Sequence, residues 1–262
     1  MLLTISIPTA ASPLSISIAP GELVFVLGPN GSGKSSLLHR IYAGNPTAYR
    51  RVTAHRQTWF TTSETAYTAH DRRQAEENFQ NWDVSKGRWQ ETHPEQRIWL
   101  ALFDLAREEN RQAREVKTLL ASGNVDRAAQ LAAGEGPLDI LSRLFQASNI
   151  PITLELRGDD LVAIRSGSDP YSSTRLSDGE RSALLLAATV LTAPHGKVFL
   201  VDEPERHLHR SIIVPFLRLL LAERPDCAFI VSTHEVMLPI DGRRLGPSFS
   251  AIVRIPEKRY GF

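Results

Sequence analysis

The sequence predicts an α/β fold with a mainly parallel central sheet, for three reasons. Short apolar segments such as Leu23–Leu27, Lys197–Val201 and Cys227–Ser232 are typical of strands buried on both faces of a parallel sheet. Segments with helical periodicity lie between these strands, as they do in α/β domains. A glycine-rich turn, Gly28–Gly33, also connects the first of these strands directly to a helical segment.

The part of the chain before residue 60 predicts four strands and one helix. Alternation of apolar and polar residues indicates the first two strands, and a Pro20-Gly21 turn introduces the third. The predicted strands are Leu2–Ile7, Pro13–Ile18, Leu23–Leu27 and Arg51–His55, and the helix runs from Ser35 to Ile41.

Between residues 63 and 148 the sequence predicts an inserted helical subdomain within one domain that spans residues 1–262. Its longest helix, Pro94–Ala121, has apolar residues with a 3.6-residue period on one side and charged residues on the other. Pro94 suits the first turn of this helix, and Gly123 suits its end. The other helices predicted here are Asp71–Asp83, Val125–Ala133 and Leu138–Ala147.

Strands and helices alternate again after residue 150. A Gly158-Asp159-Asp160 turn predicts an antiparallel hairpin, and a polar loop, Ser166–Thr174, follows it. The remaining predicted strands are Ile152–Leu156, Leu161–Arg165, Lys197–Val201, Cys227–Ser232 and Phe249–Ile255, and the remaining helices run from Ser177 to Ala193 and from Ser211 to Ala222. Pro215 is expected near the first turn of the last helix, where proline is tolerated.

The composition narrows the class of protein. With 42% hydrophobic and 23% charged residues the chain is an ordinary globular protein, and a net charge of +1 neither favours nor excludes nucleic acid. The single Cys227 excludes an intrachain disulfide and suits a reducing cytoplasm. Met1–Ala11 has no basic region and is typical of a strand rather than a signal peptide, and no apolar run is long enough to span a bilayer. We therefore expect a cytoplasmic protein with no direct membrane insertion.

The turn after Leu27 has the sequence of a phosphate-binding loop. GPNGSGKS, from Gly28 to Ser35, matches the pattern G-x-x-x-x-G-K-[ST] between a strand and a helix. Its glycines let backbone N–H groups face a phosphate, and the positive end of the helix is directed at the same anion. Lys34 is expected to reach the terminal phosphates and Ser35 to bind Mg²⁺ through its hydroxyl. The loop residues predicted to bind the nucleotide are Asn30, Gly31, Ser32, Gly33, Lys34, Ser35 and Ser36.

Two acidic residues end the strand Lys197–Val201. An acidic side chain at the carboxyl end of a parallel strand beside such a loop is placed to hold Mg²⁺, and we assign this role to Asp202. Glu203 would point a different way, and could orient or deprotonate an attacking water. By itself the pair could equally be two solvated acids, and the phosphate loop is what favours the functional interpretation.

The start of the helix at Ser177 offers a second surface for phosphate. A serine hydroxyl and the free N–H groups of a helix start come together there. An ordinary capped helix explains the same residues, and without other motifs that interpretation is favoured.

In combination, these motifs resemble those of the ABC-type ATPases. They are, in chain order, the phosphate loop, Gln57, Leu176–Glu180, Val198–Glu205 and Thr233-His234-Glu235. The resemblance implies an ABC-ATPase-type domain that binds ATP and Mg²⁺, with a second copy of the chain completing an ATP-dependent, head-to-tail homodimer around two nucleotides.

The resemblance also implies roles for individual residues. Ser177, Gly179 and Glu180 would bind the nucleotide held by the other subunit. Gln57 would bind Mg²⁺ together with Ser35 and Asp202, and would contact the attacking water. Glu203 would be the catalytic base, and His234 would contact the γ-phosphate.

Some residues depart from the pattern of transporter ATPases. Asp178 stands where these usually carry glycine, and Pro204–His209 replaces their leucine–aspartate ending. No aromatic residue stands clearly where adenine is stacked, which leaves the choice between adenine and guanine open. The chain is more similar to the OLD-family, RecF-like and SMC-like branch of AAA ATPases, found in antiphage defence and DNA repair. The segment between Gln57 and Ser177 is too short for long coiled-coil arms, which disfavours the SMC type.

Three functions remain after these comparisons of motifs. The preferred hypothesis is an ATP-driven switch that controls a nuclease-like effector or acts on DNA, the effector being a separate chain or a C-terminal domain missing from this one. The alternatives are the ATPase subunit of an ABC transporter, and a nucleotide-locked scaffold with little hydrolysis. DNA binding is only an expectation from the family, because the candidate contacts alternate with acids and are typical of a solvated helix face. These candidates are Arg72, Arg73, Arg111 and Arg114.

Overall fold

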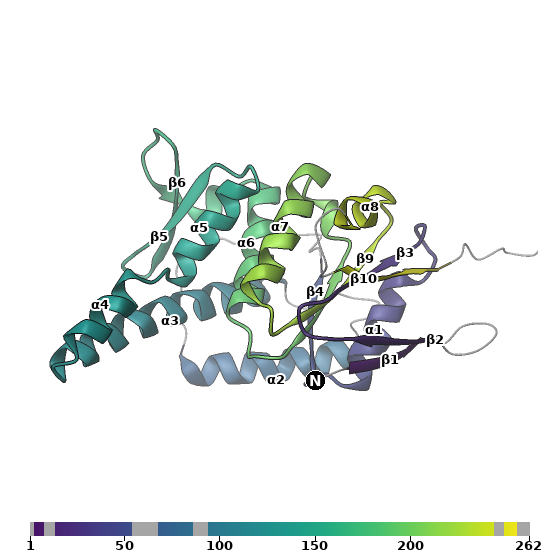
Figure 1. Ribbon diagram of the computed structural model, residues 1–262, viewed down its shortest axis with the longest axis horizontal. Coiled ribbons are helices and arrows are strands. Elements are labelled where there is room, and N and C mark those ends of the chain that lie inside the picture. Colours follow the sequence, from purple (N-terminus) through teal and green to yellow (C-terminus); the bar gives the residue numbers. More distant parts are fainter. Residues whose placement is uncertain (1–2, 8–13, 54–67, 86–93, 244–248, 256–262) are drawn as a thin grey trace, which may run out of the picture. The chain divides into compact units, whose positions relative to one another are not determined.

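The computed structural model describes residues 3–7, 14–53, 68–85, 94–243 and 249–255 (Figure 1). The chain forms two compact units, one from residues 1–56, 76–92 and 193–262, and the other from residues 57–75 and 93–192. These boundaries differ from those of the predicted helical subdomain at 63–148, which stays a prediction.

A five-stranded sheet forms the centre of the first unit. The strand order is β10-β3-β9-β8-β4, and every neighbouring pair is parallel, so the predicted fold class is confirmed. The strands are β3 (Leu23–Leu27), β4 (Tyr49–Thr53), β8 (Val198–Asp202), β9 (Ala228–Thr233) and β10 (Phe249–Arg254). All five residues of β3 and all six of β9 are buried, which explains why both segments are almost wholly apolar.

Alternate residues of the strands supply the two faces of this sheet. Val24, Leu200 and Ile230 share a buried cluster with residues of α1 (Lys34–Gly44), which packs against β8 and β9. Phe199 and Phe229 have the opposite parity, and their rings stack with centroids 5.0 Å apart. The separate antiparallel hairpin of β1 (Leu3–Ile7) and β2 (Leu14–Ile18) adds Ile5 and Ile18 to the cluster on the α1 side.

The helices that follow β8 and β9 correct one prediction and add one element. Pro215 lies inside α7 (Arg210–Glu223), beyond its first turn, where proline removes one hydrogen bond of the helix. A further short helix, α8 (Met237–Arg243), follows β9 and was not predicted. It is short and carries Pro239 and Gly242, so its sequence has no helical signal that pattern reading could detect.

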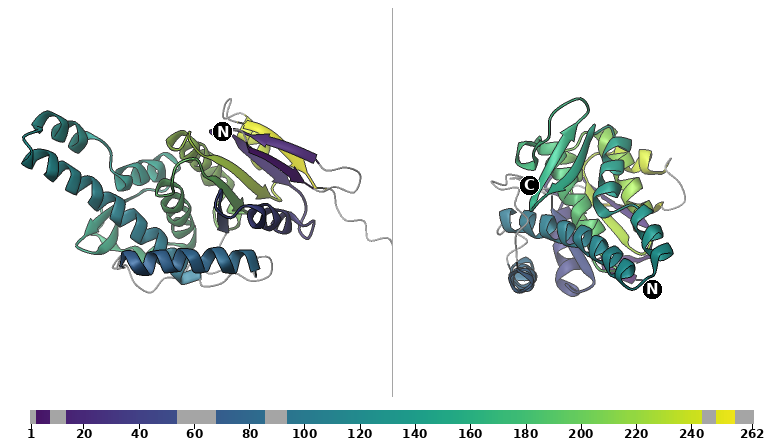
Figure 2. Two further views of the ribbon diagram at one scale, coloured as in Figure 1. Left: turned by 90° about the horizontal axis from the view of Figure 1, so that it is seen from below. Right: turned by 90° about the vertical axis from the view of Figure 1, so that its left-hand side faces the viewer.

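The second unit combines helices with a small antiparallel sheet. Helices α3 (Pro94–Ala121) and α4 (Val125–Ala133) run side by side, as Figure 2 shows. The unit also contains α5 (Pro137–Ala147) and α6 (Asp178–Leu191), while α2 (Ala69–Ser85) crosses the division between the units.

One predicted loop in this unit is partly a strand. Residues Tyr171–Ser172, inside the predicted loop Ser166–Thr174, form β7, which pairs with β6 (Asp160–Arg165) beside β5 (Ile152–Arg157). A 3-10 turn, η1 (Ser173–Arg175), follows directly. A two-residue strand has no period to read in the sequence, and only the neighbouring hairpin makes it a strand.

Among the helices that the structure describes, none has both the length and the apolar character needed to cross a membrane.

A charged cluster joins two loops of the first unit, residues 193–196 and residues 224–226. Asp226 accepts hydrogen bonds from Nε and Nη2 of Arg224, both at 2.9 Å, and from the Gly196 N–H at 3.0 Å. Arg224 also donates through Nη1 to the Ala193 carbonyl at 3.0 Å. These bonds, from Arg224 above all, hold the pKa of the Asp226 carboxyl well below its usual range.

Asp226→Asn should therefore lower the free energy of unfolding by about 2 kcal/mol at neutral pH, because charge-assisted bonds are lost. A lowered pKa in the folded state means that this stabilisation is complete above the unfolded pKa of about 4 and is lost as pH falls below it. Denaturant unfolding at pH 7 and pH 3 measures both effects. Equal stability of the two proteins at pH 7 would contradict the prediction.

Candidate functional site

The loop between β3 and α1 contains two glycines in a left-handed backbone conformation. Gly31 and Gly33 have φ angles of +78° and +97°, which side chains rarely tolerate. Gly28 is needed for a different reason, because a Cβ there would lie 2.6 Å from the Ser32 Oγ and 3.0 Å from the Ile255 carbonyl oxygen.

This loop presents donors that the protein itself leaves unused. The N-cap of α1 is Gly33, so no side chain caps the first N–H groups of the helix. The Ser32 Oγ is buried and has no hydrogen-bond partner among the described residues. An orphaned hydroxyl and an uncapped helix start in one loop fit a bound phosphate, which supplies acceptors to both.

Lys34 is the charged group of this loop. Its side chain is 3% exposed, and Nζ donates to the carbonyls of Gly28 at 2.9 Å and Pro29 at 3.1 Å. Nζ also lies 3.3 Å from Oε1 of Glu203. The partners of this buried ammonium group are two uncharged carbonyls and one carboxylate. A phosphate group with more negative charge can replace them.

The acidic pair lies at the end of β8, beside β9. Asp202 pairs in register with Ser232, whose hydroxyl donates to the Asp202 Oδ1. The Glu203 N–H donates to the Ser232 carbonyl at 3.0 Å. Ser232 therefore orients the residue predicted to bind Mg²⁺ and the backbone of the residue predicted to act as base.

Glu203 has an unusual backbone. Its φ of 47° and ψ of 56° are left-handed, a conformation that costs a non-glycine residue about 1 kcal/mol or more. Pro204 follows, and a residue before proline normally prefers extended geometry. The bend turns the Glu203 carboxylate toward Lys34 on one oxygen and toward Arg206, at 3.4 Å, on the other.

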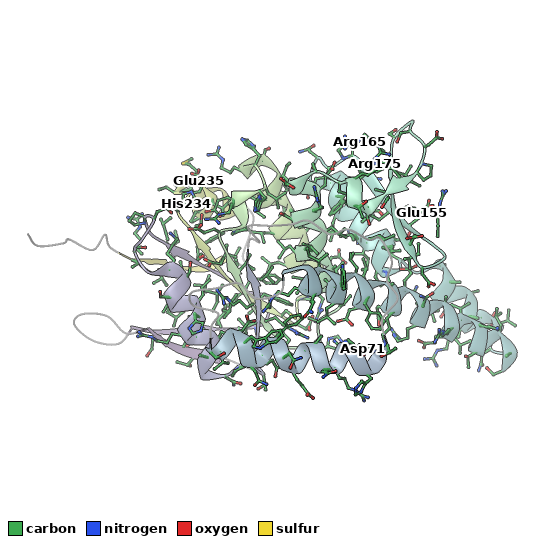
Figure 3. All side chains as sticks on the ribbon, turned by 180° about the vertical axis from the view of Figure 1, so that it is seen from behind. Asp71, Glu155, Arg165, Arg175, His234 and Glu235 are labelled. Carbon is green, nitrogen blue, oxygen red and sulfur yellow. The ribbon has the colours of Figure 1, made fainter. Side chains whose placement is uncertain are left out.

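His234 completes the group around Glu203. It follows β9 directly, its side chain is 43% exposed, and its Nδ1 lies 3.7 Å from the Glu203 Oε1. Figure 3 shows His234 beside Glu235 at this end of the first unit. The Glu203 carboxylate thus lies close to both Lys34 and His234, although the three residues are far apart in the sequence.

The remaining predicted residues lie in three parts of the chain. Ser177, Gly179 and Glu180 belong to the second unit, at the start of α6. Ser35 and Ser36 are the second and third residues of α1, and Ser35 is exposed, as is Asn30 in the loop before the helix. Gln57 lies outside the described residues.

The start of α6 is a complete capping box. The Ser177 Oγ accepts from the Glu180 N–H at 3.3 Å, and the Glu180 Oε2 accepts from the Ser177 N–H at 2.8 Å. Arg165 holds the other oxygen of Glu180 at 2.6 Å. The Glu180 carboxylate is thus engaged within its own unit, whereas Ser177 is exposed and its hydroxyl hydrogen has no acceptor among the described residues.

Two residues of the site were missed in the sequence. Ser232 orients Asp202, and Glu205 contacts Thr233 and His234. A usable signal was present: a second acid follows Glu203 by two residues, and a serine precedes Thr233-His234 at the end of a buried strand. The departure of Pro204–His209 from transporter ATPases includes Glu205, but neither Glu205 nor Ser232 has a predicted role.

Comparisons with known proteins identify the family and little beyond it. The model of the family described as "AAA domain, putative AbiEii toxin, Type IV TA system" matches residues 40–241. The zinc import ATP-binding protein ZnuC of Roseobacter denitrificans is 53% identical over 45 residues, which are 17% of this chain and 18% of that protein. ZnuC of Cereibacter sphaeroides is 51% identical over 41 residues, 16% of this chain and 17% of the relative.

The solved structures found by comparison are distant from this chain in sequence. The ATP-binding cassette MJ0796, in a dimeric structure with ADP and Pi, has a TM-score of 0.41 and 16% identity, with 100% of this chain and 99% of that chain covered. The RNase-L inhibitor has a TM-score of 0.44 and 15% identity, with 97% of this chain and 38% of that chain covered.

Proposed function

Because the chain belongs to the family described as "AAA domain, putative AbiEii toxin, Type IV TA system", we propose that it is a nucleotide-driven switch acting on another macromolecule. The chain is an ATPase domain, and its cofactors are ATP and Mg²⁺. The observation that supports the switch most directly is the meeting of Lys34, Glu203 and His234, because the same groups that would hold the phosphates also restrain the candidate base.

The chemistry follows from what each side chain can do. Lys34 would exchange its loop carbonyls and Glu203 for the terminal phosphates, which carry more charge. Glu203, released from Lys34, would accept a proton from the attacking water. Ser35 and Asp202 would hold Mg²⁺, which neutralises charge on the phosphates during transfer.

Dimerisation is part of this proposal. Ser177 is exposed, and its hydroxyl hydrogen is not needed for the capping box, so it is available to the phosphates of a nucleotide on a second copy. The start of α6 adds backbone N–H groups and a favourable dipole for the same anion.

Ser177→Arg should abolish the ATP-dependent dimer and leave the monomer folded, because a long cation fills the space that the nucleotide of the second copy needs. Ser177→Asp should also abolish it, by repelling phosphate, while it preserves the N-cap of α6. Light scattering with ATP, in a Glu203→Gln background that slows hydrolysis, measures the dimer. Ser122→Arg, the same change at an exposed serine beyond α3, is the control. Persistence of the dimer in both Ser177 variants would refute the composite site.

The identity of the partner is the open part of the proposal. We favour a protein effector in the cytoplasm and a role in antiphage defence. The family description refers to a toxin of a toxin–antitoxin system, which supports control of an effector over transport. Two of the four candidate DNA contacts are paired with acids. Arg72 pairs with Asp104 at 2.7 Å, and Arg111 pairs with Glu108 and Glu115, so both are largely neutralised.

A transporter subunit is the second candidate. The short matches to zinc import ATP-binding proteins favour it, although they cover less than a fifth of either chain. Co-purification from native membranes separates the two functions: a bound integral membrane protein supports transport, and a bound non-membrane effector supports the switch. Turnover that stays negligible with every partner would favour the nucleotide-locked scaffold.

A further inference from the structure

Glu205 is a carboxylate that the proposed mechanism does not use. It lies in η2 (Pro204–Arg206), the 3-10 turn after β8, and its side chain is only 9% exposed. One oxygen, Oε1, accepts from the Thr233 hydroxyl at 2.6 Å and from the His234 N–H at 3.1 Å. The same oxygen lies 3.2 Å from the His234 Nδ1.

The second oxygen of Glu205 makes this arrangement unfavourable for stability. Oε2 is buried and has no hydrogen-bond partner among the described residues. An unsatisfied buried acceptor on a charged group destabilises a protein, and an apolar side chain of similar size would avoid that cost. A carboxylate kept in such a place is better explained by what it does to its neighbours than by stability.

The neighbour that it controls is His234. A carboxylate oxygen only accepts, and at 3.2 Å it repels the lone pair of an Nδ1 without hydrogen, so this contact favours the tautomer with the hydrogen on Nδ1. The Glu203 oxygen is farther from this nitrogen, at 3.7 Å, which makes Glu205 the principal partner. Nε2, the other ring nitrogen, is then directed away from Glu205, in a side chain that is 43% exposed.

The backbone around His234 is held by the same group. Thr233 donates its hydroxyl hydrogen to Glu205, and its oxygen in turn accepts from the Glu235 N–H at 3.0 Å. Glu205 therefore restrains the residues on both sides of the imidazole as well as the ring itself. The hydrogen bond from the His234 backbone N–H and the contact with Nδ1 together hold one carboxylate oxygen beside the ring.

We propose that Glu205 is the positioning residue of His234: it sets the tautomer and the direction of the imidazole, so that Nε2 faces the terminal phosphate. The proposal rests on the ATPase function proposed above, because it assumes that His234 acts on the nucleotide. Glu205 itself touches neither nucleotide nor water in this scheme.

The kinetic test is a double-mutant cycle with Glu205→Gln and His234→Ala. Glu205→Gln should lower kcat of ATP hydrolysis about 10- to 100-fold with little change in KM, because the amide keeps the shape but not the negative charge that favours the hydrogen on Nδ1. In the His234→Ala background the same change should have almost no further effect. Glu155→Gln, on an exposed strand residue, is the matched control and should leave kcat unchanged.

A spectroscopic test needs no hydrolysis. Long-range ¹⁵N–¹H correlations of the nucleotide-free protein should show a hydrogen on Nδ1 of His234, assigned as the signal missing in His234→Gln among the 8 histidines. Glu205→Gln should shift this residue toward the Nε2–H tautomer. An Nδ1 without hydrogen in the wild type would overturn the proposal, even if Glu205→Gln failed to fold.

The two tests separate the possible failures. If the wild type shows no ATP turnover but the Nδ1 hydrogen is present and depends on Glu205, the ATPase proposal fails and the positioning contact stands. If kcat losses of the two single variants multiply in the double variant, Glu205 acts independently of His234 and the positioning role is wrong.

Discussion

Lys34→Ala should weaken ATP binding by about 100-fold or more. Hydrogen bonds to a charged group contribute roughly 1.5–3 kcal/mol each, and Lys34 is placed to make two or more of them with the terminal phosphates. To make these bonds, the Lys34 Nζ gives up its contacts with two loop carbonyls, at 2.9 and 3.1 Å, and with Glu203, at 3.3 Å. Titration calorimetry with ATP and Mg²⁺ measures the loss.

The control for this variant has to address folding, because Lys34 is buried and its removal leaves Glu203 with one cationic partner fewer. Lys34→Arg keeps the charge and should bind ATP better than Lys34→Ala. Lys117→Ala changes an exposed lysine of α3 in the same way and should bind like the wild type. Unchanged affinity in a folded Lys34→Ala protein would refute the assignment of the phosphate loop.

Glu203→Gln should lower ATP hydrolysis by about 100-fold or more and leave ATP bound. The amide has the shape of the carboxylate but cannot take a proton from water, and loss of a general base typically costs about 10²–10⁴-fold. The change also removes the ion pair with Lys34, so affinity for ATP should equal or exceed that of the wild type. Single-turnover hydrolysis and equilibrium binding together test both statements.

The outcome also bears on the left-handed backbone of Glu203. Glutamine has a similar conformational cost at φ 47°, so stability should change little through the backbone. If the Glu203→Gln variant hydrolyses ATP at the wild-type rate, another group is the base. Glu205→Gln in the His234→Ala background identifies whether that group is Glu205, because a positioning residue has almost no further effect there and a base does.

Three features of this site are unfavourable for stability. The left-handed Glu203, the buried Ser32 Oγ and the buried Glu205 Oε2 all lie in the loops that follow β3 and β8. Ordinary local rules favour other choices at each of these positions. Such exceptions are expected where function, and not stability, selects the residue.

Local sequence was sufficient for the elements that depend on near neighbours. Strand β3 and helix α3 have the predicted bounds, because an apolar run and a long 3.6-residue period each identify an element without help from the rest of the fold. Strand β7 and helix α8 were missed because both are short and depend on contacts with other segments. The predicted roles of Ser177, Gln57 and His234 came from resemblance to ABC-type ATPases and stay predictions.

What the sequence alone determined is the loop from Gly28 to Ser35, since its glycine conformations and its helix start are set within eight successive positions. What only the tertiary structure decided is which side chains meet there. Parallel strands β8 and β9 lie side by side in a register that pairs Asp202 with Ser232, and this brings Glu203 and Glu205 to His234. These contacts join residues about 30 positions apart in the chain. They depend on the strand order of the sheet, which no local sequence pattern encodes.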